Sequence, residues 1–288
     1  MKMRPVVAAV DGSEPSMRAV EWSALEAQRH RAPLRIVSTL GAPSRAYVYR
    51  TPDLAGSLRS ASARALGDAV IRAGEVAPDL TICVDLLHGP LASAITGCGA
   101  AALMLVVGEG RLGAHGPAFL SSVTRYTATH AACPVVVVQD DTDAVRGEVA
   151  VGIRDPRNIG DCLAFAFEEA ALRHATLVAV HAWRRALPEL GGRLGAAVVT
   201  ERRDDARAIS AQLAEDMAAA IGCWRDKYPS VPVRQDVVEG HPALILPRYS
   251  ARADLVVLGR HDRAAGRAAG AVRDVVLHRA RGPVAIVP

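Results

Sequence analysis

A short apolar run that occurs twice decides the fold. Residues 6 to 11 read V-V-A-A-V-D and residues 149 to 154 read V-A-V-G-I-R, so the two runs lie 143 residues apart and both end at a polar residue. At the same offset, Glu26-Ala27 matches Glu169-Ala170 without a gap. Similarity that recurs at a fixed spacing indicates two copies of one structural unit.

The match extends to the end of the chain with small changes in offset. L-V-V-G at 105 to 108 matches V-V-L-G at 256 to 259, an offset of 151. C-P-V-V-V-V at 133 to 138 matches G-P-V-A-I-V at 282 to 287, an offset of 149. Insertions and deletions between elements explain this drift. We therefore predict a tandem repeat that covers nearly the whole chain.

Apolar runs alternate with helical patterns inside each copy. Four apolar residues recur at helical spacing after the first run: Met17, Val20, Ala24 and Ala27. Ser13 and Pro15 supply the start signals of this helix. The resulting order predicts an α/β fold, with five mostly parallel strands per copy and helices on both faces of each sheet. We predict domain 1 at 1–143 and domain 2 at 144–288. The long insertions at 41–60 and 184–207 are either lids or merely surface, and the residues leave both interpretations open.

Composition argues against several classes of function. The net charge is +4 and no basic block occurs, so we expect no nucleic-acid partner. The five cysteines contain no C-x-x-C pair, which disfavours zinc and redox sites and predicts reduced, buried thiols: Cys83, Cys98, Cys133, Cys162 and Cys223. The apolar stretch near residue 1 is too short for a signal peptide and no eighteen apolar residues run together, so we expect a cytoplasmic protein with no membrane contact.

A glycine-rich loop follows the fourth predicted strand. Residues 106 to 123 read V-V-G-E-G-R-L-G-A-H-G-P-A-F-L-S-S-V and contain G-x-G-x-x-G at Gly108, Gly110 and Gly113. In a dinucleotide-binding fold the helix starts inside these glycines, whereas Gly116-Pro117 continues the loop here. A P-loop is excluded because the chain has no G-x-x-x-x-G-K-S/T motif. The loop is therefore interpreted as a longer phosphate cradle that ends at Ser121-Ser122, near a helix start.

The turn after the first strand lies at the same predicted edge as this loop. Ligands of open α/β sheets bind beyond the carboxyl ends of the strands, which is where Asp11-Gly12-Ser13, His88-Gly89-Pro90 and the Gly108 loop fall. Asp11 has two interpretations that the residues leave open: it contacts the ligand, or it caps the following helix together with Ser13.

These motifs resemble the universal stress protein family in its tandem form. The resemblance rests on V-D-G-S at 10 to 13, on V-V-G followed by a glycine loop that ends in S-S-V, and on H-A-A-C-P-V-V-V-V at 130 to 138. It implies flavodoxin-like, Rossmann-like units that bind ATP, with Mg²⁺, in a stress-response regulator. It also implies that Asp11 meets the nucleoside and that the loop positions fall on Gly108, Arg111, Ser121 and Ser122, so two of the family's three glycines are replaced.

The departures from the family pattern differ between the two copies. Gly110 or Gly113 could relax the turn in place of the glycine replaced by Arg111, which could also attract phosphate. Ser121 is the more serious departure. In domain 2 the residues at the motif positions are Arg154, Asp262, Gly270 and Ala271. We expect ATP in domain 1 and a chiefly structural domain 2, unless Asp155 replaces the missing acid.

No catalytic set can be singled out, so we predict a protein that is not an enzyme, with weak ATP hydrolysis as an open alternative. His88 and His241 are interpreted as turn residues, and His130 and His278 as helix-end residues.

The valine-rich last strands predict edge-to-edge pairing of the two copies inside one chain, and a homodimer of chains is a further expectation. The rival hypothesis is a scaffold of the same fold that binds no nucleotide.

Overall fold

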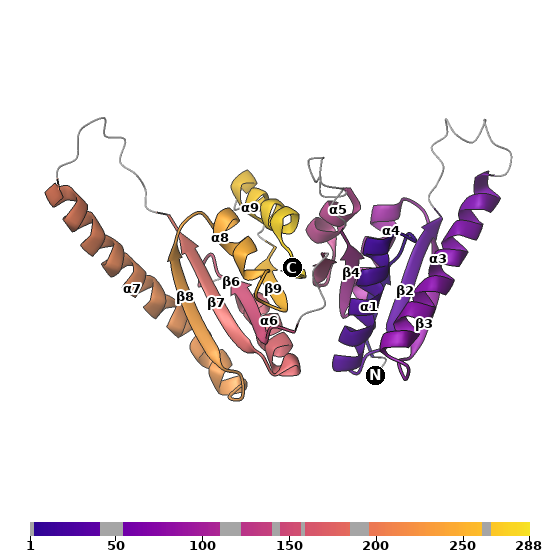
Figure 1. Ribbon diagram of the computed structural model, residues 1–288, viewed down its shortest axis with the longest axis horizontal. Helices are drawn as coiled ribbons and strands as arrows, with labels where there is room; N and C mark the ends of the chain where they lie inside the picture. Colours follow the sequence, from indigo (N-terminus) through magenta and orange to yellow (C-terminus); the bar gives the residue numbers. More distant parts are fainter. Residues whose placement is uncertain are drawn as a thin grey trace.

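The computed structural model describes residues 3–40, 54–109, 122–139, 145–156, 159–184, 196–260 and 266–288 (Figure 1). Domain 1 contains, in order, β1 (Val6–Ala9), α1 (Glu14–Arg29), β2 (Leu34–Leu40), α3 (Leu54–Val76), β3 (Ile82–His88), α4 (Leu91–Gly97), a 3₁₀ turn (Cys98–Ala101), β4 (Met104–Gly108), α5 (Ser122–His130) and β5 (Val135–Val138). Domain 2 contains β6 (Glu148–Gly152), α6 (Gly160–Arg173), β7 (Thr176–Trp183), α7 (Ala196–Lys227), β8 (Val233–Glu239), α8 (Pro242–Tyr249), β9 (Leu255–Gly259), α9 (Gly266–Arg279) and β10 (Val284–Val287).

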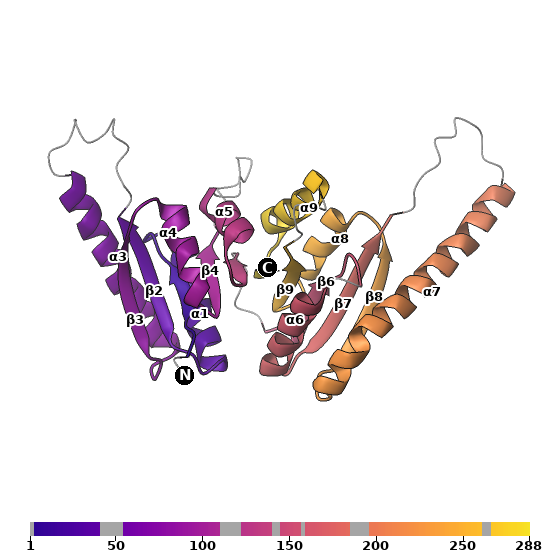
Figure 2. The same ribbon diagram turned by 180° about the vertical axis from the view of Figure 1, so that it is seen from behind.

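The strands form one ten-stranded sheet in the order β3-β2-β1-β4-β5-β10-β9-β6-β7-β8. Within each domain the described strands pair in parallel, as in β1 with β2 and β6 with β7. The domains join where β10 pairs with β5 in antiparallel orientation, with Ala285 opposite Val136. The two halves lie side by side, with α3 and α7 at the outer ends in both views (Figures 1 and 2). The predicted α/β tandem fold is confirmed.

Alternation of apolar residues along the strands divides the core into two layers. Val136 and Val138 of β5 face the layer that also contains α1, α3, α6 and α7. Val135 and Val137 face the opposite layer, with residues of α5, α8 and α9. Because strand residues alternate between faces, an all-valine strand supplies both layers, as expected for strands buried on both sides.

One expectation needs correction and others lie outside the described residues. The insertions at 41–60 and 184–207 lead into helices, since α3 begins at Leu54 and α7 begins at Ala196. The prediction of buried thiols is confirmed for Cys133 and Cys162, whereas Cys98 is only half-buried. It is wrong for Cys83 on the outer strand β3 and for Cys223 on α7, which are exposed. The boundary between 143 and 144 adjoins residues outside the described ranges and stays a prediction. No helix in the described part of the chain is long and apolar enough to span a bilayer.

A cluster of buried charges connects the helices on one face of the sheet. We call Glu26 and His30 of α1 with Glu169 and Arg173 of α6 the interdomain charge cluster. Arg173 Nη2 donates to Glu26 Oε2 at 2.5 Å, and His30 Nε2 lies 2.9 Å from Glu169 Oε1. The four side chains are at most 6% exposed. Since isolated buried charges are costly, the two domains depend on each other for charge compensation.

Candidate functional site

The turn after β1 is organised by hydrogen bonds among its own side chains. Asp11 Oδ1 accepts hydrogen bonds from the Ser13 backbone N–H at 2.9 Å and from Ser13 Oγ at 2.6 Å. Ser13 is the N-cap of α1, and its Oγ accepts a bond from the Ser16 N–H at 3.4 Å. Gly12 has φ of +87°, a conformation that disfavours a side chain. The sequence therefore places a helix cap and a tight turn at the carboxyl end of β1.

This arrangement leaves Asp11 available to a ligand. Partial burial would raise the pKa of Asp11, but the Ser13 side-chain and backbone hydrogen bonds outweigh burial and lower the pKa below its usual value. The carboxylate is therefore ionised at neutral pH. Both bonds from Ser13 end on Oδ1, so Oδ2 can accept a further bond from the hydroxyl groups of a sugar. The capping interpretation and the ligand interpretation are compatible.

Gly108 brings the glycine loop and this turn together. A Cβ at Gly108 would lie 2.1 Å from Pro15 O, in the first turn of α1, so only glycine permits this approach. The end of β4 and the N-terminus of α1 are therefore packed backbone against backbone. Since β1 and β4 pair in parallel, their carboxyl ends form one ligand-facing edge.

The far side of the loop is described only in part. Gly110, Arg111, Gly113 and Ser121 lie outside the described residues, so their roles stay predictions. Ser122 is the exposed first residue of α5. Its position at a helix N-terminus is suited to an anion.

The corresponding edge of domain 2 has different chemistry. Arg154 occupies the position of Asp11 and is exposed. At the 143-residue offset, Gly160 at the start of α6 aligns with Met17, so α6 begins almost one turn later than α1. An added Cβ at Gly259, the counterpart of Gly108, would meet nothing within 4 Å. Domain 2 therefore lacks the close approach that shapes the edge of domain 1.

Comparison with known proteins agrees with this tandem architecture. The model of the universal stress protein family matches residues 2–139 and 148–288. The chain belongs to the universal stress protein family. The universal stress protein Rv2005c of Mycobacterium tuberculosis is 32% identical over 301 residues, covering 99% of this chain and 97% of the relative. A universal stress protein of Mycolicibacterium smegmatis is 31% identical, covering 98% and 96% of the two chains.

A solved structure of a universal stress protein from Archaeoglobus fulgidus shares the fold. Its TM-score is 0.67 at 15% sequence identity, and the match covers 98% of this chain and 95% of that one. This likeness shows that the family fold extends over both domains. Each of the two copies therefore has the fold of this family.

Sequence reasoning missed Glu109 in this family member. Glu109 directly follows Gly108, and its Oε2 accepts a hydrogen bond of 2.5 Å from Thr124 Oγ1 of α5. This bond ties the first residue of the glycine loop to the helix that ends the loop. An acidic residue directly after a strand-terminal glycine was the available signal.

The sequence identifies Glu26 and Glu169 only as equivalent positions of the two copies and does not predict that they belong to one buried cluster. Their signal was a glutamate inside each apolar helical face, a position that requires a buried partner. The ligand atoms of Glu26, His30 and Glu169 lie within 4.8 Å of one another, a spacing that a metal could use. Arg173 pairs with both carboxylates, so the cluster already contains its own positive charge.

Among the histidines interpreted as turn residues, His241 is the N-cap of α8.

Proposed function

We propose that this universal stress protein is a non-catalytic, nucleotide-responsive regulator of the cytoplasm whose domain 1 binds ATP at the carboxyl ends of β1 and β4. The observation that supports this most is the contact between Gly108 and the first turn of α1, which places an ionised Asp11 beside the start of the glycine loop. The family resemblance assigns nucleoside contact to Asp11 and phosphate contact to the glycine loop. The two features therefore serve opposite ends of one ligand.

The residues present are compatible with that ligand. Asp11 Oδ2 accepts from the ribose hydroxyls, while Ser13 keeps the carboxylate oriented through Oδ1. Ser122 offers its hydroxyl and the N-terminus of α5 to phosphate oxygens. Arg111 adds a positive charge in the loop, and Mg²⁺ accompanies the triphosphate as its counter-ion. No described residue is assigned a proton transfer, so binding and release are the proposed output.

ATP titration of the full chain tests this proposal. We expect calorimetry to show one ATP per chain and the Asp11→Asn variant to bind about tenfold more weakly, because a charge-assisted bond to the sugar is lost. Asp68→Asn removes an exposed carboxylate from α3 and is expected to leave ATP affinity unchanged. No heat and no retained nucleotide in native mass spectrometry at millimolar ATP would overturn the proposal in favour of a scaffold. Phosphate release that depends on Asp11 would instead indicate an ATPase.

A further inference from the structure

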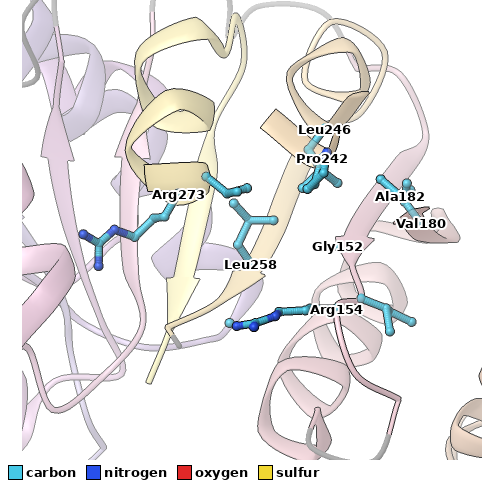
Figure 3. A pocket seen from close by; sticks show the side chains of 11 residues that line it. Gly152, Arg154, Val180, Ala182, Pro242, Leu246, Leu258 and Arg273 are labelled. Atoms are coloured by element: carbon cyan, nitrogen blue, oxygen red, sulfur yellow. The ribbon is translucent and has the colours of Figure 1, made fainter. Parts of the chain in front are cut away.

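Domain 2 contains a pocket of about 220 Å³ at the carboxyl ends of β6 and β9 (Figure 3). Apolar side chains from β7, β9, α8, α9 and the residue that follows β6 line it: Ile153, Val180, Ala182, Leu246, Leu258 and Val272. A cavity of about 150 Å³ with walls of this kind is enough to bind a benzene-sized molecule. The pocket is therefore large enough for a small ligand with an apolar body.

The pocket exists because the edge of domain 2 is built differently from that of domain 1. Gly152 lies on its wall, where a Cβ would stand 2.7 Å from Leu258 Cδ2. Gly259 also lines the pocket, whereas its counterpart Gly108 is covered by the first turn of α1. The later start of α6 removes the corresponding cover in domain 2.

Arg154 supplies the charge at this pocket. Its side chain is exposed and forms no hydrogen bond or ion pair within the described part of the chain. In Figure 3 it extends beneath Leu258, along the lower margin of the pocket. The other lining arginine, Arg273, is paired with Asp274 Oδ1 at 2.8 Å and directs its guanidinium away from Leu258. The pocket therefore combines apolar walls with a guanidinium, that of Arg154, which has no ion pair among the residues that the structure describes.

We propose that the domain 2 pocket binds a small amphipathic carboxylate. The apolar body lies between Leu246 and Leu258, and the carboxylate pairs with Arg154, whose planar fork matches two oxygens. A nucleotide is a poorer match, because the acid that meets the sugar in domain 1 is replaced by Arg154 itself. Domain 2 thus has a ligand of its own, independent of ATP binding in domain 1.

Titration of the full chain with octanoate, and with 1-octanol as a neutral analogue, tests the proposal. We expect octanoate to bind one site, with methyl NMR shifts at Leu246 and Leu258, and at least about tenfold more tightly than 1-octanol. Arg154→Asp should abolish this preference by weakening octanoate alone. Arg248→Asp, an exposed charge reversal on α8 outside the pocket, should change neither affinity. Ala182→Phe fills the pocket and should abolish binding of both compounds.

Several outcomes would overturn this assignment. Equal affinities of octanoate and 1-octanol in the wild-type chain would remove the role of Arg154. Shifts confined to methyl groups outside the pocket, or no binding at millimolar octanoate, would exclude the site. Displacement of octanoate from Leu246 and Leu258 by ATP would identify a nucleotide site instead. Because Ala182→Phe can disturb folding, its thermal unfolding is compared with that of the wild type, while exposed Arg154→Asp provides the independent test.

Discussion

His30 Nε2 of domain 1 lies 2.9 Å from Glu169 Oε1 of domain 2. A second pair, Arg173 of domain 2 with Glu26 of domain 1, crosses the same boundary in the opposite direction. At the 143-residue offset, His30 aligns with Arg173 and Glu26 aligns with Glu169. Each copy therefore contributes one glutamate and one cation, and each glutamate faces the cation of the other copy. The repeat has used the same helical positions twice to build one buried set of mutually paired charges. This reciprocity makes the position of α1 relative to α6 specific.

Removal of one cation from the interdomain charge cluster should be strongly destabilising. In Arg173→Met the two buried glutamates lose their shared partner, so we expect the free energy of unfolding to fall by about 3–5 kcal/mol in urea denaturation. Arg72→Met is the matched control, because Arg72 pairs with Glu21 at the surface and is 37% exposed. The control should change stability far less, because a solvent-exposed ion pair is screened by water and salt. Equal losses would contradict a special role for the cluster.

Alkaline pH should weaken the same cluster through His30. Burial lowers the pKa of His30, but bonds and charges from Glu169 and Glu26 outweigh it and raise the pKa to about 10, against 6.5 for an ordinary histidine. The stabilisation that cationic His30 contributes is therefore fully present below the pKa of histidine in the unfolded chain, 6.5. It is lost as the pH rises through the pKa of His30 in the folded protein, about 10. Burial and the charge of Glu26 raise the pKa of Glu169 to about 7, so its titration is largely complete before this window.

We therefore expect urea denaturation to show a decline in stability between about pH 7.5 and 10, of the order of 1–3 kcal/mol. His30→Gln should be less stable at neutral pH and should show a flatter profile over that window. Arg29 also acts on Glu26 from α1 but keeps its charge throughout, so it does not contribute to the slope. An unchanged slope in His30→Gln would assign the decline to other groups.

The two strand-terminal glycines should respond differently to the same substitution. In Gly108→Ala the new Cβ would meet Pro15 O at 2.1 Å, so the first turn of α1 must shift. We expect a loss of about 1–3 kcal/mol in thermal unfolding, together with weaker ATP binding. Gly259→Ala meets nothing within 4 Å and should stay within about 0.5 kcal/mol of the wild type. A reversed order would mean that the first turn of α1 is not tightly packed.

Gln139 should contribute to the pairing of the domains. Its side chain is buried, with 2% of the residue exposed, and Nε2 donates to Leu277 O of α9 at 2.8 Å. In Gln139→Ala the buried carbonyl loses its partner, so chemical denaturation should show a loss of about 1–2 kcal/mol. Gln28→Ala on the exposed face of α1 should change stability by less than about 0.5 kcal/mol. A neutral effect at Gln139 would show that water replaces the lost donor.

Local signals predicted much of domain 1. Ser13 and Pro15 predicted a helix start, and α1 begins at Glu14 with Ser13 as its N-cap. The apolar stripe predicted at Met17 and Val20 is buried against the sheet. These predictions succeed because capping and periodicity depend on residues a few positions apart. The role of Asp11 was only partly predictable, since the hydrogen bonds from Ser13 decide which of its oxygens stays available.

The sequence by itself determined that the chain is a tandem α/β repeat, because each copy repeats the same apolar periods and turn residues. Only the tertiary structure decided that His30 meets Glu169, because these residues lie 139 positions apart on helices of different copies. Spacing along the chain contains no information about which buried charge faces which. The same holds for the domain 2 pocket, which depends on where α6 starts relative to β9. Local chemistry specified the elements, and long-range packing specified which side chains act together.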